Sequence, residues 1–142
     1  MATEYTAAAV QLVNAGSNVQ FTDNPIRCTK GYVQHREGSG LFTLRGITSN
    51  CFARYKVFFD GNIAVPADAT PDEISLSIAI DGEPLAASMG AFTPAIAGRY
   101  GNVSMVAFID VPKCCCTSIA IENTSAIPID VRNANLVIDR VA

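Results

Sequence analysis

The segment Ala53–Val65 alternates between apolar and polar side chains with the period of a β-strand. One parity carries the apolar residues Ala53, Tyr55, Val57, Phe59, Ile63 and Val65, and the other carries Arg54, Lys56, Asp60 and Asn62. Successive side chains of a strand point to opposite faces, so this pattern predicts one buried and one solvated face. Phe58 is the exception, because it places a large apolar side chain among the polar positions. The wider segment His35–Pro66 predicts two strands joined by a polar loop, as in the middle of an antiparallel sandwich.

Short strand patterns recur at close spacing along the rest of the chain. Alternation or β-branched residues predict further strands at Val10–Val13, Val19–Phe21, Tyr32–His35, Ile74–Ile80, Leu85–Met89, Val103–Val111, Cys115–Glu122, Ile127–Arg132 and Asn135–Val141. Turn signals separate them, and Asp81-Gly82 is of the kind that closes a tight hairpin. No segment has a convincing helical pattern. About eight to ten short strands at this spacing predict an all-β sandwich or barrel.

The last predicted strand differs from the others because both of its faces are apolar. Leu136 and Ile138 lie on one face, and Val137 and Val141 lie on the other. A strand that is apolar on both faces is covered on both faces. Charged residues make up only 16% of the chain, against about 25% in typical globular proteins. Both features predict an oligomer in which a neighbouring subunit supplies the second cover.

Composition also limits the classes of partner. The net charge is −3 and no Lys/Arg cluster offsets it, so we expect no nucleic-acid partner. No apolar run is long enough to span a bilayer, so we expect no membrane partner. The N-terminal residues lack the pattern of a signal peptide. We therefore expect synthesis in a cytoplasm, with any export occurring as part of a larger particle or by lysis.

Five cysteines are present, of which Cys28 and Cys51 are isolated and Cys114, Cys115 and Cys116 are consecutive. An odd number without a secretion signal does not indicate a disulfide framework. On a strand, Cys114 and Cys116 would share one face and Cys115 would lie on the other. Free cysteines are most often buried, so we predict reduced, structural thiols. A disulfide or a metal site remains the alternative.

Several segments together resemble one fold class. They are Asn18–Phe21 as an opening strand, Gly38–Leu44 leading to Ala53–Phe59, the hairpin Ile78–Leu85 and the closing run Asn133–Ile138. Taken together, this order of strands resembles the tumour-necrosis-factor-like jelly roll, which complement globular heads and the C-terminal domains of bacterial collagen-like surface proteins share. The hairpin resembles the one that bacterial and phage-encoded members place in the middle of the domain.

The resemblance implies an antiparallel jelly-roll sandwich that assembles as a homotrimer, with the terminal strand along the threefold axis. It assigns Phe58, Leu136, Val137 and Ile138 to the trimer interface. Members of this class are binding heads or structural knobs, so we expect no enzyme. We predict a jelly-roll domain over residues 18–142, preceded by a flexible arm or attachment segment over residues 1–17.

The chain lacks a Gly-x-y stalk and a visible signal, which favours a virion accessory protein over a stalked surface protein. The hypothesis is a phage capsid decoration protein or head-fibre knob, made in the host cytoplasm and displayed on the virion surface. Its arm would bind the major capsid protein or another virion component. The alternative is a receptor- or glycan-binding head of a tail fibre, or of a bacterial collagen-like cell-surface or spore protein. Arg99 and Tyr100, in a Gly-flanked loop, are the candidate ligand contacts.

Candidates for chemistry are few. His35 is the one histidine, and no motif supplies a nucleophile beside it, so we expect a hydrogen-bonding role in a loop or interface. Acidic residues occur at Asp60, Asp68, Asp72, Glu73, Asp81 and Glu83, without the spacing of a calcium loop. We expect no cofactor and no metal. Calcium is the alternative, because members of the resembled class sometimes hold it near the trimer axis.

Overall fold

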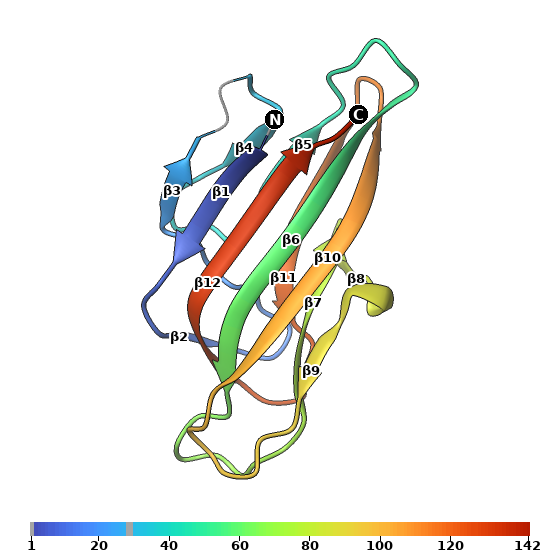
Figure 1. The fold of residues 1–142 in the computed structure, drawn as a ribbon. Helices are drawn as coiled ribbons and strands as arrows, with labels where there is room; N and C mark the ends of the chain where they lie inside the picture. The colour runs from blue at the N-terminus through green and yellow to red at the C-terminus, as the bar shows by residue number, and fades with distance from the viewer. Residues whose placement is uncertain (1, 28–29) are drawn as a thin grey trace.

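The computed structural model describes residues 2–27 and 30–142, which form two antiparallel sheets packed face to face (Figure 1). The first sheet has the order β10-β6-β12-β1-β3, and β2 also pairs with β12. Its strands are β1 (Ala2–Ala7), β2 (Gln11–Val13), β3 (Asp23–Ile26), β6 (Phe52–Ala64), β10 (Gly101–Pro112) and β12 (Ile129–Arg140). The predicted all-β antiparallel sandwich is confirmed.

The second sheet has the order β4-β5-β11-β7-β8, and β9 also pairs with β7. Its strands are β4 (Val33–His35), β5 (Phe42–Arg45), β7 (Ile74–Ile80), β8 (Glu83–Pro84), β9 (Gly90–Phe92) and β11 (Cys116–Asn123), and one short 3₁₀ helix spans Ala86–Ser88. Asp81 and Gly82 have positive φ angles of 51° and 88° in the tight turn between β7 and β8. The hairpin predicted at this dipeptide is therefore confirmed. No helix among the described residues is long and apolar enough to cross a membrane.

β6 organises the first sheet because it pairs along most of its length with β10 on one side and β12 on the other. Its inward side chains Tyr55, Val57 and Phe59 have no exposed surface. The buried hydroxyl of Tyr55 donates to the carbonyl oxygen of Arg45 at 2.5 Å, which ties β6 to β5 of the opposite sheet. The alternation along β6 thus builds one half of the core, as predicted.

An aromatic cluster joins the two sheets across this core. The ring of Phe42 on β5 lies edge-on to Tyr5 at 4.7 Å and to Phe21 at 5.5 Å. The ring of Phe21 also lies edge-on to that of Phe59 at 6.3 Å. Edge-to-face pairs of this kind are favourable beyond the area they bury. The cluster connects β1, the segment after β2, β5 and β6.

The predicted flexible arm is wrong, because its residues form part of the first sheet. β1 pairs with β12 from Ala2, opposite Asp139, to Ala7, opposite Ala134, and with β3 on its other side. Thr3, Tyr5 and Ala7 point inward and are buried. Threonine and alanine are weak hydrophobic signals, so this alternation was missed. The sandwich therefore includes residues 2–17, and the predicted boundary between residues 17 and 18 is not present.

Replacing Tyr5 by alanine tests whether β1 is structural. Tyr5 is 1% exposed and contacts the rings of Phe42 and His35. Removing a buried aromatic side chain leaves a cavity and costs about 3–5 kcal/mol of unfolding free energy. Chemical denaturation should show that loss for Tyr5→Ala. Val10→Ala, at an exposed site in the same N-terminal region, is the control and should change the free energy by less than about 0.5 kcal/mol. A Tyr5→Ala variant with the same free energy of unfolding as the wild type would instead support a flexible arm.

Candidate interaction surface

The outer face of β10, β6 and β12 carries an apolar patch, made of the exposed Phe58, Val106 and Phe108 and the half-buried Val137. Phe58 lies directly opposite Val106 on one side and Val137 on the other, so the three side chains form one cross-strand row. Phe108 lies two residues further along β10, on the same face. The exposed fractions are 39% for Phe58, 50% for Val106 and 62% for Phe108. Other exposed apolar side chains, such as Leu12 and Ile96, lie on a short strand and in a loop.

Two shallow hollows adjoin the patch. One has a volume of about 220 Å³ and is lined by Lys56, Phe58, Val137 and Asp139. The other has a volume of about 320 Å³ and is lined by Arg54, Phe108 and Asp110. The face therefore combines protruding apolar side chains with depressions of side-chain size. A surface of this shape is better suited to contact another protein than to enclose a small ligand.

An ion pair borders the patch at one end of β6 and β10. The Nε and Nη2 atoms of Arg54 donate to the two carboxylate oxygens of Asp110 at 2.8 and 3.0 Å. This fork-to-fork bond holds the pKa of Asp110 below its ordinary value and raises the pKa of Arg54. The guanidinium of Arg54 also lies 5.1 Å from the centre of the Phe52 ring. The two charges are thus matched within the face.

A ladder of polar side chains borders the patch at the other end. Asp60 Oδ1 accepts hydrogen bonds from Asn102 Nδ2 at 2.7 Å and from Ser104 Oγ at 3.1 Å. Asn102 Nδ2 also donates to Asn62 Oδ1, and Asn62 Nδ2 donates to Asn133 Oδ1, both at 3.2 Å. These side chains therefore satisfy one another's hydrogen-bonding groups across the three strands β10, β6 and β12. The polar groups beside the patch can therefore be covered at a lower desolvation cost than isolated ones.

The structure separates the four predicted interface residues into two pairs. Phe58 and Val137 lie side by side on the outer face. Leu136 and Ile138 point into the core and have no exposed surface, so neither can contact a second copy, and their assignment to an interface is wrong. Val106 and Phe108 were missed as interface candidates. The signal that could have found Phe108 is the one noted for Phe58, an apolar residue on the polar parity of its strand.

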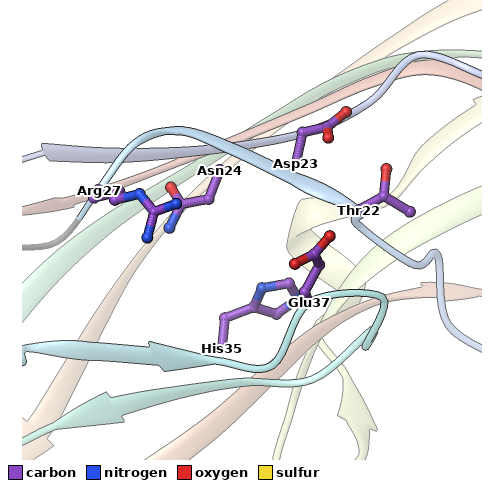
Figure 2. Close-up of a pocket in the computed structure, with 6 residues that line it drawn as sticks. All are labelled: Thr22, Asp23, Asn24, Arg27, His35 and Glu37. Atoms are coloured by element: carbon purple, nitrogen blue, oxygen red, sulfur yellow. The ribbon is translucent and has the colours of Figure 1, made fainter.

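A separate pocket lies where β3 and β4 approach one another (Figure 2). It has a volume of about 240 Å³ and is lined by Thr22, Asp23, Asn24, Arg27, His35 and Glu37. Figure 2 shows these side chains coming from two chain segments on either side of the pocket, with His35 and Glu37 on one of them. The lining offers carboxylates, a guanidinium, an amide and a hydroxyl. These groups can bind a polar ligand through hydrogen bonds.

His35 forms part of this pocket and is held in place by its surroundings. Its ring stacks on Phe42 with centroids 4.2 Å apart and lies edge-on to Tyr5. Its Nε2 atom lies 2.7 Å from the carbonyl oxygen of Ser39. A carbonyl oxygen only accepts, so Nε2 carries the proton and donates it. The predicted hydrogen-bonding role of this histidine is confirmed.

The predicted ligand contacts Arg99 and Tyr100 lie in the loop before β10. Arg99 is exposed, whereas Tyr100 is half-buried. The guanidinium of Arg132 lies over the Tyr100 ring, 3.8 Å from its centre. This cation–π contact occupies one face of the ring, so that face cannot act as a stacking platform for a sugar. Ligand binding by this loop stays a prediction.

The prediction of buried thiols is wrong for the cysteines that the structure describes. Cys51, Cys114, Cys115 and Cys116 are all exposed and unpaired with one another. Cys114 and Cys115 lie in the turn between β10 and β11, not inside a strand. Cys28 lies outside the described residues. Over residues 2–27 and 30–142, no three His, Cys, Asp or Glu side chains converge on a site suited to a metal ion.

Three solved structures of animal proteins are similar to this chain, and each of the three shares little sequence with it. The globular domain of the zebrafish complement 1qA protein has a TM-score of 0.70 and 13% identity, over 99% of this chain and 97% of that one. The Eiger TNF of S. frugiperda has a TM-score of 0.72 and 11% identity, over 100% and 92%. Murine APRIL has a TM-score of 0.68 and 7% identity, over 99% and 98%.

No model of a known protein family and no curated protein sequence matches the chain. The structural similarity nevertheless extends over nearly the whole chain and over nearly the whole of each matched domain. It confirms the fold class that the order of strands resembled, while the bacterial or phage-encoded kind stays a prediction. The chain has the tumour-necrosis-factor-like jelly-roll fold.

Proposed function

We propose that the chain is a non-enzymatic structural subunit that assembles as a homotrimer through the outer face of β10, β6 and β12. The observation that carries this proposal is the apolar patch of Phe58, Val106, Phe108 and Val137 on a sheet face that the rest of the protomer leaves uncovered. Three copies, rather than two, are proposed because the resemblance to the tumour-necrosis-factor-like class implies a trimer.

Burial of the patch beneath a second copy of the chain would be favourable in free energy. Full burial of a Phe or Val side chain contributes about 1.5–3 kcal/mol relative to exposure. Aromatic residues near the centre of a contact commonly supply much of its binding free energy. Phe58 lies at the centre of this face, since its strand has a neighbour on each side. The matched Arg54–Asp110 pair and the hydrogen-bonded Asp60 lie at the two ends of the patch, where an interface has its polar rim.

Within this proposal, the trimer is an accessory protein on the surface of a virion, as a capsid decoration protein or head-fibre knob. The sequence resemblance of the β7–β8 hairpin to phage-encoded members supports this role. The contact with a capsid protein is assigned to an end of the trimer, because β1 is held in the sheet and cannot serve as an arm. Capsid genes beside the gene for this chain are the expected genomic context. A collagen-like or sporulation operon would instead favour a bacterial surface protein.

Light scattering during size-exclusion chromatography tests the trimer. At micromolar concentration we expect a mass of about 45 kDa, three times the 15.0 kDa of one chain. The double variant Phe58→Ser/Phe108→Ser should elute as a folded monomer, because both side chains are exposed in the protomer. Leu12→Ser, which replaces an equally exposed apolar side chain outside the patch, is the control and should remain trimeric. A monomeric wild-type protein, or a trimeric double variant, would contradict the proposed interface.

A polar-ligand-binding head is a second candidate function, favoured by the pocket at His35. The pocket lies beside β3, and β3 and β10 are opposite edges of the first sheet. The pocket and the apolar patch share no residue. Binding and assembly through these two regions are therefore compatible.

A glycan array tests this second function. If the pocket binds a sugar, at least one glycan should bind the wild-type protein and bind Glu37→Gln about tenfold more weakly, the loss of about 1.4 kcal/mol that one weakened polar contact can cause. Asp72→Asn, at an exposed position outside the pocket lining, should bind as the wild type does. No bound glycan, or equal binding by Glu37→Gln, would remove the support for a glycan-binding head.

A further inference from the structure

Four exposed thiols lie on two adjacent loops at one end of the sandwich. Cys51 directly precedes β6, Cys114 and Cys115 lie in the β10–β11 turn, and Cys116 begins β11. The backbone N–H of Lys113 donates to the carbonyl oxygen of Cys51 at 3.0 Å, so the two loops touch. Figure 1 shows this turn and the loop before β6 together at the end where the C-terminus lies.

Backbone hydrogen bonds hold this turn in place. Cys114 N–H donates to the Gly46 carbonyl oxygen at 3.0 Å, and Gly46 N–H donates to that of Cys115 at 2.8 Å. A Cβ atom at Gly46 would lie 2.1 Å from the carbonyl oxygen of Pro112, so the two backbones pack directly against each other. None of these contacts uses a thiol.

One of these positions is also poorly suited to a cysteine on structural grounds. Cys114 has a φ angle of 65°, in the left-handed region that favours glycine and asparagine. Free cysteines in folded proteins are most often buried, whereas these four are exposed. The fold accounts for neither their exposure nor their number. A residue kept in an unfavourable conformation points to a function for its side chain.

Neighbouring cysteines in this turn are unsuited to pairing with each other. Successive Cα atoms are about 3.8 Å apart, which is shorter than the roughly 4.4–6.8 Å that separates the Cα atoms of a disulfide. Cys115 therefore cannot form an unstrained disulfide with either Cys114 or Cys116. An unstrained disulfide of Cys115 would need a thiol outside the turn.

We propose that these thiols form disulfides between adjacent copies in the trimer and so link it covalently. This inference rests on the proposed trimer. β6 and β10, which carry Phe58, Val106 and Phe108, begin and end at the thiols, so contact through that face brings the thiol-bearing ends of neighbouring copies together. In a threefold ring each copy has a neighbour on either side. Two thiols per copy are then the minimum that closes the ring, and this end offers four.

The chemistry requires an oxidant of the class of low-molecular-weight disulfides, such as oxidised glutathione. The thiolate of one copy attacks a sulfur of the oxidant, forms a mixed disulfide and releases one reduced thiol. A thiolate of the adjacent copy then attacks the protein sulfur of that mixed disulfide and releases the second reduced thiol. Two protein thiols lose two electrons in total, and the small disulfide gains them together with two protons.

Non-reducing gel electrophoresis after equilibration with reduced and oxidised glutathione tests the inference, with Cys28→Ser in every sample. We expect a band near 45 kDa, three times 15.0 kDa, which returns to a single chain on treatment with dithiothreitol. A variant that keeps only Cys115 should give no band above a two-chain species, because a ring of three cannot close with one thiol per copy. The variant with all four cysteines replaced by serine should remain a single chain.

Light scattering on the same samples distinguishes a failure of the disulfide inference from a failure of the proposed trimer. A native trimer that loses thiols without gaining covalent mass contains disulfides within one chain, which overturns the inference and leaves the trimer intact. A ladder beyond three chains that grows with protein concentration indicates collisions between particles and also overturns it. A native monomer overturns the proposed function itself.

Discussion

The alternation of side chains along β6 is the constraint on which the rest of the structure depends. This strand has thirteen residues and a neighbour on each side, so its inward residues form the centre of the core and its outward residues the centre of the outer face. Tyr55, Val57 and Phe59 fill the core without exposed surface. The same period places Phe58 outward, between Val106 and Val137. A change of register by one residue would exchange the two faces. The core and the outer patch therefore both depend on the same alternation along β6.

The charges around the patch suit it for coverage by another protein. Arg54 lowers the pKa of Asp110 and so keeps that carboxylate ionised and paired. An exposed ion pair of this kind adds little to the stability of a protomer. Its value lies in matching the charges of Arg54 and Asp110 to each other when water is removed. Lys56, which lies directly opposite Phe108, also has Asp139 of β12 directly opposite it on its other side. At the other end of β6, neutral donors on Asn102 and Ser104 satisfy the Oδ1 acceptor of Asp60.

Sequence reasoning predicted the parts of the fold that have strong local signals. The period of β6 and the Asp81-Gly82 turn were sufficient for the sandwich and one hairpin. β1 was missed because two of its three buried residues are Thr3 and Ala7, whose apolar character is weak. Leu136 and Ile138 were misassigned because a strand with two apolar faces does not reveal which face is inward. The thiols were misplaced because a preference for burial is a property of cysteine in general, whereas Cys114 lies in a turn set by backbone contacts with Gly46.

Hydroxyl-radical footprinting with mass spectrometry tests the central claim most directly, because it reports the exposure of individual side chains in the assembled protein. Phe59 has no exposed surface and is the internal reference for a buried ring, next in sequence to Phe58. We predict that Phe58 and Phe108 react as slowly as Phe59 in the native protein and that all three react alike after denaturation. Rapid native oxidation of Phe58 and Phe108, in keeping with their exposed fractions of 39% and 62% in the protomer, would show that no second copy covers this face.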